Sequence, residues 1–479
     1  MRARGLQAHL EAPLGRGHTP AGAFTGAAGG AACGDLVRVS VAVEGGRVAD
    51  AGFDAAGCGA ALAAGSAAVA LARGRPLLEA ARMGPAEVAA ELGGLIAPKR
   101  HAAELAADAL HRALGAAARA QARLPGADGR TLVAMSGGVD SAVAALLAAR
   151  AGGEVVGVTL ELWADRDHDP EASCCSASAV RGARALAHRM GLPHLTLDLR
   201  AEFRAGVVQP YLDDHAAGLT PNPCIRCNGH VRLDAMLDLA QRLGAEGLAT
   251  GHYARVVDDG AGPLLRAAAD PAKDQSYVLA ALEPGSLGRL RFPLGELTKP
   301  QVRALAAEAG LPVAAKRDSQ DLCFLAGTDR AAFLARHGGI GQRPGEIVDR
   351  RGRALGRHRG HTAYTVGQRK GLGVAAGEPL YVLATDSRAN RVTVGRRSEL
   401  RRDHLTVRAA TLRRHAARVD RVKLRYRSKP LPCRVVGFPP AGRHGKLELA
   451  LGEPVHGAAP GQAAVLLDGD VIVGHATIA

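Results

Sequence analysis

Residues 131–149 read T-L-V-A-M-S-G-G-V-D-S-A-V-A-A-L-L-A-A, which is a short β-rich run, a glycine turn and an Ala/Leu-rich helix. This order predicts a strand, a loop and a helix that bind an anion. Gly137 and Gly138 let backbone amides approach a phosphate, and the start of the helix adds positive potential. The hydroxyls of Ser136 and Ser141 can donate hydrogen bonds. The stretch lacks G-x-x-x-x-G-K-[ST], so transfer of a γ-phosphate assisted by a loop lysine is not indicated.

A glycine turn alone is as often a plain connection as a binding site, but the string S-G-G-V-D-S is more specific. It resembles the pyrophosphate-binding loop of the N-type ATP pyrophosphatases, which cleave ATP to AMP and pyrophosphate and activate a carbonyl or carboxylate oxygen with the adenylyl group. The resemblance implies that this loop binds ATP. The implied contacts are Ala134, Met135, Ser136, Gly137, Gly138, Val139, Asp140 and Ser141.

Three later stretches predict further strands, separated by helical stretches. They read E-V-V-G-V-T-L-E-L-W (154–163), H-L-T-L-D-L (194–199) and G-L-A-T-G-H-Y (247–253). Strands that alternate with helices are typical of an α/β fold with a doubly wound parallel sheet. Because the ligand of such a sheet lies beyond the carboxyl ends of its strands, Leu160 and Gly251 are predicted to line the adenosine pocket.

Size and charge restrict the class of protein. A chain of 479 residues with 47% hydrophobic content predicts two to four globular domains. No apolar run approaches the roughly 18 residues of a membrane helix, so a cytoplasmic protein is expected. An Arg- and Ala-rich beginning is typical of an organellar transit peptide, but the same composition runs along the whole chain. The net charge of +15 is concentrated between Arg391 and Arg434, where 15 Lys and Arg face three acids. This excess suits RNA or, equally, a solvated basic surface.

Eight cysteines are too sparse and irregular for a disulfide framework, but two of them form a C-x-x-C pair. Residues 220–228 read T-P-N-P-C-I-R-C-N, with Cys224 and Cys227 in a segment that cannot be helical throughout. Structural zinc, thioredoxin-like redox chemistry and sulfur or iron–sulfur chemistry all use such a pair.

Several strings, taken in order, identify a family. They are T-P-N-P-C-I-R-C-N at 220, A-T-G-H-Y at 249, K-D-Q-S-Y at 273, D-S-Q-D-L-C-F at 318 and Y-T-V-G-Q-R-K-G-L-G at 364. From about residue 130 to 479 the chain resembles the tRNA-uridine 2-sulfurtransferases, or 2-thiouridylases. The resemblance implies thiolation of C2 of the wobble uridine, U34, in Lys, Glu and Gln tRNAs, with ATP and Mg²⁺. The implied sulfur source is a cysteine desulfurase or a sulfur-relay protein.

The resemblance also assigns roles to individual residues. Cys323 takes the persulfide, and Cys227 is the partner that assists release of sulfur through a disulfide. Cys174, Cys175 and Cys433 are expected to be structural, as most isolated cysteines are. The implied tRNA contacts are Asn222, His252, Lys273, Asp274, Gln275, Gln368, Arg425 and Tyr426.

Cys224 leaves the source of sulfur open, because some members of the family have aspartate at this position. With three thiols, Cys224, Cys227 and Cys323 could hold a [4Fe–4S] cluster whose fourth iron binds hydrosulfide. The alternative is a metal-free persulfide and disulfide mechanism in which Cys224 is accessory.

The N-terminal part resembles a second family, the IscU/NifU iron–sulfur scaffolds. The matching strings are C-G-D (33–35), F-D-A-A-G-C (53–58) and A-P-K-R-H-A-A-E-L-A-A-D-A-L (97–110). Ala102 stands where that family has its last cysteine. The four remaining ligands suit zinc or an iron–sulfur centre. They are Cys33, Asp35, Cys58 and His101. Three interpretations stay open: a docking module for a cysteine desulfurase, a cluster donor, or a degenerate appendage.

These resemblances predict an α+β scaffold-like domain, a pyrophosphatase-type α/β domain, a small middle domain and a C-terminal β-barrel. A thiolase acting on another base, a GMP- or argininosuccinate-type synthetase, and an iron–sulfur scaffold with a dead nucleotide fold are the alternatives. The expected boundaries are a flexible leader at 1–32, the scaffold domain at 33–118, a linker at 119–130, the catalytic domain at 131–325, the middle domain at 326–398 and the barrel at 399–479.

Overall fold

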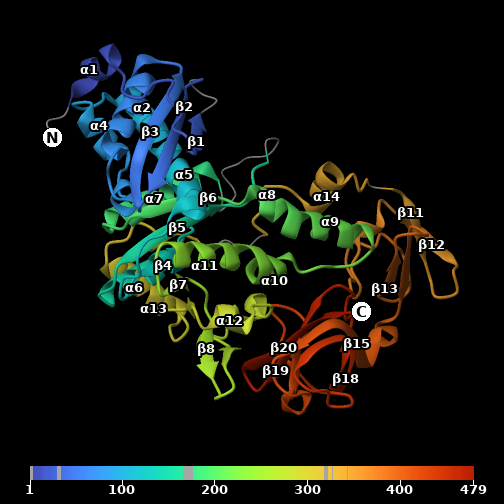
Figure 1. Ribbon diagram of the computed structural model, residues 1–479. Helices are drawn as coiled ribbons and strands as arrows, with labels where there is room; N and C mark the ends of the chain where they lie inside the picture. Colours follow the sequence, from blue (N-terminus) through green and yellow to red (C-terminus); the bar gives the residue numbers. More distant parts are fainter. Residues whose placement is uncertain (1–3, 30–33, 166–175, 318–321, 326, 342) are drawn as a thin grey trace. The chain divides into compact units, whose positions relative to one another are not determined.

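The computed structural model divides the chain into two compact units, whose elements are labelled in Figure 1. The first unit comprises Met1–Ala201, Leu233–His252 and Arg289–Phe324, and the second comprises Glu202–Arg232, Tyr253–Gly288 and Leu325–Ala479. The structure describes residues 4–29, 34–165, 176–317, 322–325, 327–341 and 343–479.

The first unit begins with a three-stranded antiparallel sheet in the order β1-β2-β3. In β2 the valines at 37, 39 and 41 are buried while Arg38 is exposed, which is the alternation of a strand with one covered face. The strands are β1 (Phe24–Gly29), β2 (Leu36–Glu44) and β3 (Arg47–Ala56). The helices are α1 (Gly5–Glu11), α2 (Gly59–Ala72), α3 (Leu77–Ala80), α4 (Pro85–Glu91) and α5 (Arg100–Gln121).

This module already includes the segment predicted as a flexible leader. His9, on α1, is fully buried and lies 2.8 Å from the Ser66 hydroxyl, while β1 pairs with β2 along its whole length. The predicted leader is wrong for residues 4–29, because burial and strand pairing hold them in the module.

A five-stranded sheet follows, in the order β10-β7-β4-β5-β6, and all of its pairs are parallel. Every residue of β5 is buried, as expected for a parallel sheet covered by helices on both faces. The predicted α/β sheet is thus confirmed. Its strands are β4 (Thr131–Ala134), β5 (Val155–Glu161), β6 (His194–Asp198), β7 (Gly247–Thr250) and β10 (Leu290–Arg291), and its helices are α6 (Val139–Arg150), α7 (Ala177–Arg189), α11 (Leu233–Arg242) and α13 (Lys299–Glu308).

Helix α5 packs both on β1 and β2 of the small sheet and on β6 of the parallel sheet (Figure 1). Two glycines permit this close packing. A Cβ at Gly26 would lie 2.1 Å from the carbonyl oxygen of Ala109, and a Cβ at Gly115 would lie 1.9 Å from that of Thr196. One helix therefore serves two hydrophobic cores.

Charged side chains also join α5 to α7 and to β5. Asp108 on α5 pairs with Arg184 on α7 at 2.9 Å, and both side chains are almost fully buried. Arg112, one turn further along α5, pairs with Glu161 at the end of β5 at 2.6 Å. The predicted linker at 119–130 begins inside α5, and the amide of Leu124 then donates to the carbonyl of Arg242.

The second unit contains a four-stranded sheet and a closed barrel. The sheet has the order β12-β11-β14-β13, and pairing of β15 with β20 closes the barrel β15-β18-β17-β16-β19-β20, which β9 and β8 extend. Its strands are β8 (Arg255–Asp258), β9 (Pro263–Arg266), β11 (Gly345–Val348), β12 (Ala354–His358), β13 (Tyr381–Asp386), β14 (Arg391–Gly395), β15 (Arg401–Leu412), β16 (Arg421–Lys423), β17 (Leu431–Val435), β18 (Gly442–His456), β19 (Ala463–Asp468) and β20 (Val471–Ile478). Its helices include α9 (Gln209–Ala216), α10 (Pro223–Cys227), α12 (Pro284–Leu287) and α14 (Arg330–Gly338).

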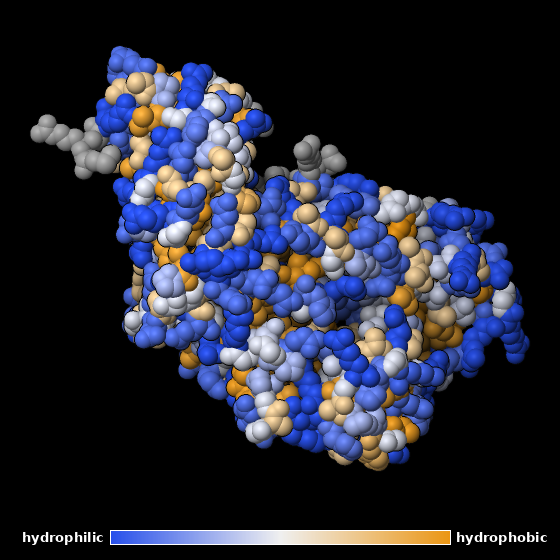
Figure 2. All heavy atoms as spheres, viewed as in Figure 1, coloured by the Kyte–Doolittle hydropathy of each residue, from blue (hydrophilic) through white to orange (hydrophobic). Residues whose placement is uncertain are grey.

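Polar and charged side chains cover much of the face drawn in Figure 2, with apolar residues interspersed among them. Within the described residues, no helix combines the length and the apolar character that crossing a membrane requires.

Candidate functional site

The glycine-serine loop connects β4 to α6 at the carboxyl end of β4. Gly137 has a φ of +69°, a conformation that glycine adopts without strain, and Gly138 is the N-cap of α6. The Ser141 hydroxyl accepts a hydrogen bond from the Ser136 amide at 3.1 Å and lies 3.2 Å from the Ser136 hydroxyl. The loop therefore forms the predicted turn between a strand and the start of a helix, and its binding of an anion stays a prediction.

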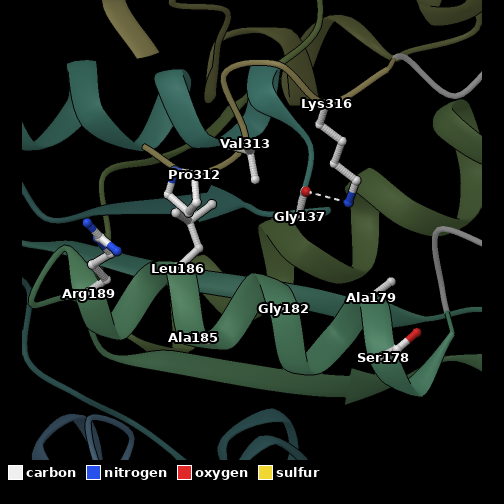
Figure 3. Close-up of a pocket in the computed structure, with 10 residues that line it drawn as sticks. All are labelled: Gly137, Ser178, Ala179, Gly182, Ala185, Leu186, Arg189, Pro312, Val313 and Lys316. Carbon is white, nitrogen blue, oxygen red and sulfur yellow. Dashed lines mark hydrogen bonds between the residues drawn. The ribbon is translucent and has the colours of Figure 1, made fainter. Parts of the chain in front are cut away.

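Two lysines from a distant part of the chain lie against this loop. The Lys299 ammonium, at the start of α13, lies 2.7 Å and 2.8 Å from the two carboxylate oxygens of Asp140. The Lys316 ammonium donates to the Gly137 carbonyl oxygen at 2.9 Å (Figure 3). Sequence analysis missed both lysines, because they follow the loop by 159 and 179 residues and no local pattern connects them to it.

The two residues predicted to line the adenosine pocket take different positions. Leu160 is buried within β5, near its end. Gly251 follows β7 and packs directly on the first turn of α6, since a Cβ there would lie 2.7 Å from the Ser141 amide nitrogen. A side chain at position 251 would displace the start of α6, so this glycine holds the loop close to the sheet.

The cysteine pair lies in a single helical turn. Pro223 is the first residue of α10, and the Asn222 side chain caps this helix by accepting from the amide of Cys224 at 3.1 Å. Burial raises the pKa of the Cys224 thiol, and the positive charge of Arg232 partly offsets this. A π-helical segment, Asn228–Arg232, continues the chain from Cys227. Such segments are frequent at functional sites.

Several residues predicted to contact tRNA surround this turn within the second unit. Burial raises the pKa of the Tyr426 hydroxyl, and the negative charges of Asp274 and Cys224 raise it further. Asp274 is itself paired with Lys423 at 3.1 Å. The Arg425 guanidinium donates to the carbonyl of Gly457 at 2.8 Å. Cys224, Asp274 and Tyr426 therefore belong to one neighbourhood, although they are far apart in the sequence.

The other predicted tRNA contacts have structural partners. The Gln275 side chain accepts from the amide of Tyr253 at 3.0 Å, and Gln368 accepts from the amide of Thr365 at 3.0 Å. His252 lies 2.8 Å from the Thr250 hydroxyl. Lys273 lies in a turn where its amide donates to the carbonyl of Asp270. These contacts orient the segments and leave the tRNA roles as predictions.

The remaining cysteines fall into three groups. Cys323 is half-buried and belongs to the first unit, whereas Cys227 is buried and belongs to the second, so their pairing stays a prediction. Cys433 is buried, and burial raises its pKa to about 12, which fits the structural role expected for it. Cys33, Cys174 and Cys175 lie outside the described residues.

Three predicted metal ligands of the N-terminal module come together. The ligand atoms of Asp35, Cys58 and His101 all lie within 4.8 Å of one another. The Asp35 carboxylate is 3.0 Å from His101 Nε2 and 3.1 Å from the Cys58 sulfur. A Cβ at Gly57 would lie 2.0 Å from an Asp35 oxygen, so glycine leaves room for this cradle. Ala102, next to His101, is fully buried.

The electrostatics of this cradle suit a cation. Burial alone would raise the pKa of Asp35, but hydrogen bonds from the Cys58 amide, His101 and the Cys58 thiol outweigh burial and lower it to about 2. His101 Nδ1 lies 2.9 Å from the Pro98 carbonyl oxygen, so an N–H there fixes the ring with Nε2 toward Asp35, and a cation would take the place of the Nε2 proton between the two side chains. An oxygen, a sulfur and a nitrogen donor fit zinc.

The parallel sheet, its glycine-serine loop and the two β modules define a nucleotide-binding protein with added β domains. The sequence matches four family models. They are the NifU-like N terminal domain (residues 4–123), the tRNA methyl transferase HUP domain (129–327), the tRNA methyl transferase PRC-barrel domain (331–396) and the Aminomethyltransferase beta-barrel domain (401–478).

Relatives extend over the same regions. The chain is 44% identical to a bifunctional protein NifU/MnmA of Rubrobacter xylanophilus, over 98% of this chain and 97% of the relative. It is 44% identical to a tRNA-specific 2-thiouridylase MnmA of Acidithiobacillus ferrooxidans, over 73% of this chain and 97% of that protein. The chain therefore belongs to the MnmA family and carries an N-terminal NifU-like domain, as the sequence strings indicated.

Among solved structures, the chain is similar to a 4-thiouridine synthetase in complex with RNA and bound ATP. The TM-score is 0.27 at 18% identity, covering 42% of this chain and 46% of that one. The family assignment rests on the sequence relatives.

Proposed function

We propose that this protein is a tRNA-uridine 2-sulfurtransferase that converts the wobble uridine, U34, to 2-thiouridine with ATP and Mg²⁺. The proposed substrates are the Lys, Glu and Gln tRNAs, and the proposed location is the cytoplasm. The observation that carries the proposal is the folded nucleotide loop at the end of β4, in a chain that is 44% identical to tRNA-specific 2-thiouridylases.

The proposed reaction has two steps. First, the C2 oxygen of uracil attacks the α-phosphorus of ATP, and the bond to the leaving pyrophosphate breaks. This converts a poor leaving group into AMP. Second, the terminal sulfur of a persulfide on Cys323 attacks C2, and AMP leaves with the C2 oxygen. Cys227 then attacks the sulfur of Cys323, which leaves the transferred sulfur on uridine and a disulfide that an external thiol reduces.

The test is mass spectrometry of tRNA wobble nucleosides after incubation with ATP, a sulfur source and the protein. The wild type should form 2-thiouridine, and the Cys323→Ala variant should not. Release of pyrophosphate by the variant would show that the nucleotide site is intact. Absence of 2-thiouridine from the wild type would overturn the proposal.

A second mechanism delivers sulfur through a [4Fe–4S] cluster on Cys224, Cys227 and Cys323. The observation in its favour is that Cys224 and Cys227 share one helical turn. Burial raises the pKa of the Cys224 thiol, so iron would have to displace the proton of this thiol on binding. Iron analysis and visible absorption of anaerobically purified protein decide between the two. A colourless, iron-free and active enzyme excludes the cluster.

For the N-terminal module we propose docking of a cysteine desulfurase, with Asp35, Cys58 and His101 holding zinc or an iron–sulfur centre. Bound zinc would fix the three side chains around one ion. The point variant His101→Ala should lower the bound zinc per chain, and His18→Ala, in the same module, is the matched control. Thiolation by His101→Ala should fall with desulfurase and persist with free sulfide. Equal loss with both sulfur sources would contradict docking.

A further inference from the structure

The nucleotide loop lacks a lysine of its own, although a polyphosphate carries several negative charges. The amides of the loop and the start of α6 together supply only about half of one positive charge. Asp140, in the first turn of α6, is negative and would repel a phosphate. Bound Mg²⁺ would offset part of this charge, and a cation from elsewhere in the chain would offset more of it.

Of the two lysines beside the loop, Lys299 is already neutralised. It is buried, and its ammonium contacts both carboxylate oxygens of Asp140. This ion pair removes the repulsion that Asp140 would exert on a phosphate, but it leaves no net positive charge. Lys299 is thus a positioning residue.

Lys316 is differently placed. Its side chain is exposed, it forms no ion pair within the part of the chain that the structure describes, and its ammonium lies 2.9 Å from the Gly137 carbonyl oxygen. Lys316 and Gly137 both line a cavity of about 410 Å³ between α7 and residues 312–316. Figure 3 shows the Lys316 side chain reaching to Gly137, with Arg189 at the opposite end of α7.

We propose that Lys316 is the phosphate-binding lysine of this loop, supplied by the segment after α13. Its ammonium contacts the β- and γ-phosphates of ATP and then the pyrophosphate. As the bond between the α-phosphorus and the bridging oxygen breaks, the electron pair stays on pyrophosphate, and the ammonium offsets that negative charge. This inference rests on the proposed ATP-dependent activation of the tRNA.

The matched variants are Lys316→Met, Lys316→Arg and, as a control away from the cavity, Arg38→Met on β2. Binding of inorganic pyrophosphate to each full-length protein is measured by calorimetry, without tRNA. Lys316→Met should weaken this binding at least tenfold, Lys316→Arg should restore much of it, and Arg38→Met should match the wild type. Thermal unfolding of each variant checks that it is folded.

Steady-state release of pyrophosphate with ATP, a sulfur source and saturating tRNA completes the test. Lys316→Met should lower kcat by about 100-fold, the usual size for loss of one charged donor to a transition state. Equal pyrophosphate binding and equal kcat in folded Lys316→Met and wild type would overturn the proposal, as would wild-type protein that binds no pyrophosphate. If pyrophosphate release depends on Lys316 but no 2-thiouridine forms, the proposed function fails and the role of Lys316 stands.

Discussion

At the scale of single residues, the buried pair of Asp108 and Arg184 is central to the first unit. The carboxylate belongs to the NifU-like module and the guanidinium to α7 of the parallel sheet. Burial lowers the pKa of Arg184, and the charge and hydrogen bond of Asp108 oppose this effect. Each charged side chain can therefore be buried only because the other neutralises it.

We expect Asp108→Asn to destabilise the first unit by about 3–5 kcal/mol, because it leaves Arg184 charged and buried without its counterion. The matched control is Asp198→Asn, which removes the exposed partner of Arg200 and should cost at most about 1 kcal/mol. Chemical unfolding followed by circular dichroism measures both. Similar losses for the two variants would contradict this account.

The residues of the nucleotide loop could be predicted because they are adjacent in the sequence and their types are specific. Lys299 and Lys316 could not be predicted, because only the fold brings them to the loop. The candidate metal ligands Asp35, Cys58 and His101 were predicted from short strings, and the structure brings these three side chains together.

At the scale of elements, α5 is the helix whose position sequence reasoning described least well. Residues 97–110 contributed to the resemblance to the scaffold family, and the predicted boundary at residue 118 and linker from 119 place the whole segment in one domain. It ends at Gln121 and packs on both sheets. Residues such as Glu104, Arg112 and Arg119 mark the less buried side of α5, but the sequence does not tell which of its buried residues face which sheet.

Gly115→Ala should destabilise the protein by about 1–3 kcal/mol, although alanine is the better helix former, since its methyl group would overlap the Thr196 carbonyl. Gly182→Ala is the matched control. Gly182 lies inside α7, and a Cβ there meets nothing within 4 Å. This change should be neutral or stabilise by up to about 1 kcal/mol. Thermal unfolding compares the two, and equal effects would argue against the close contact of α5 and β6.

His194, the first residue of β6, should make the stability of the first unit depend on pH. Burial lowers the pKa of its imidazole well below the ordinary value, and the charges of Arg184 and His188 add to this. The unfolded chain therefore binds a proton that the folded chain rejects, so stability should be full above about pH 7 and fall as the pH drops below about 6.5. Unfolding midpoints measured between about pH 8 and pH 5 should show a smaller slope for His194→Asn. An unchanged slope would contradict this assignment.

At the scale of the whole molecule, some of the basic residues between Arg391 and Arg434 are paired with acids. These ion pairs reduce the net positive charge at the surface below the value that the sequence alone suggests. Arg414 and Arg418 both pair with Asp259, and Lys423 pairs with Asp274. Arg408 and Lys446 differ, because they face each other across β15 and β18, and both are exposed. Like charges directly opposite on two strands destabilise a sheet unless an anion lies between them.

The double variant Arg408→Gln/Lys446→Gln should weaken binding of tRNA and reduce the slope of log affinity against log salt by up to about 1.5–2, the value for two lost phosphate contacts. Arg38→Gln, an exposed arginine of β2, is the matched control and should leave the slope unchanged. Filter binding over a range of salt concentrations measures the slope. An unchanged slope in the double variant would show that this part of the barrel does not contact the tRNA backbone.

Because α5 packs on both sheets, dividing the chain after this helix would separate surfaces that are buried against each other. A polypeptide that starts after residue 123 would expose the face of β6 and leave the Arg184 guanidinium without Asp108, while residues 1–123 would expose the second face of α5. The two fragments, produced separately, should therefore complement each other by binding along this face. If truncation of the module abolished activity, damage to the parallel sheet would explain the loss as well as the absence of a docking site for the sulfur donor. The role of the module is therefore tested by point substitutions in the intact chain.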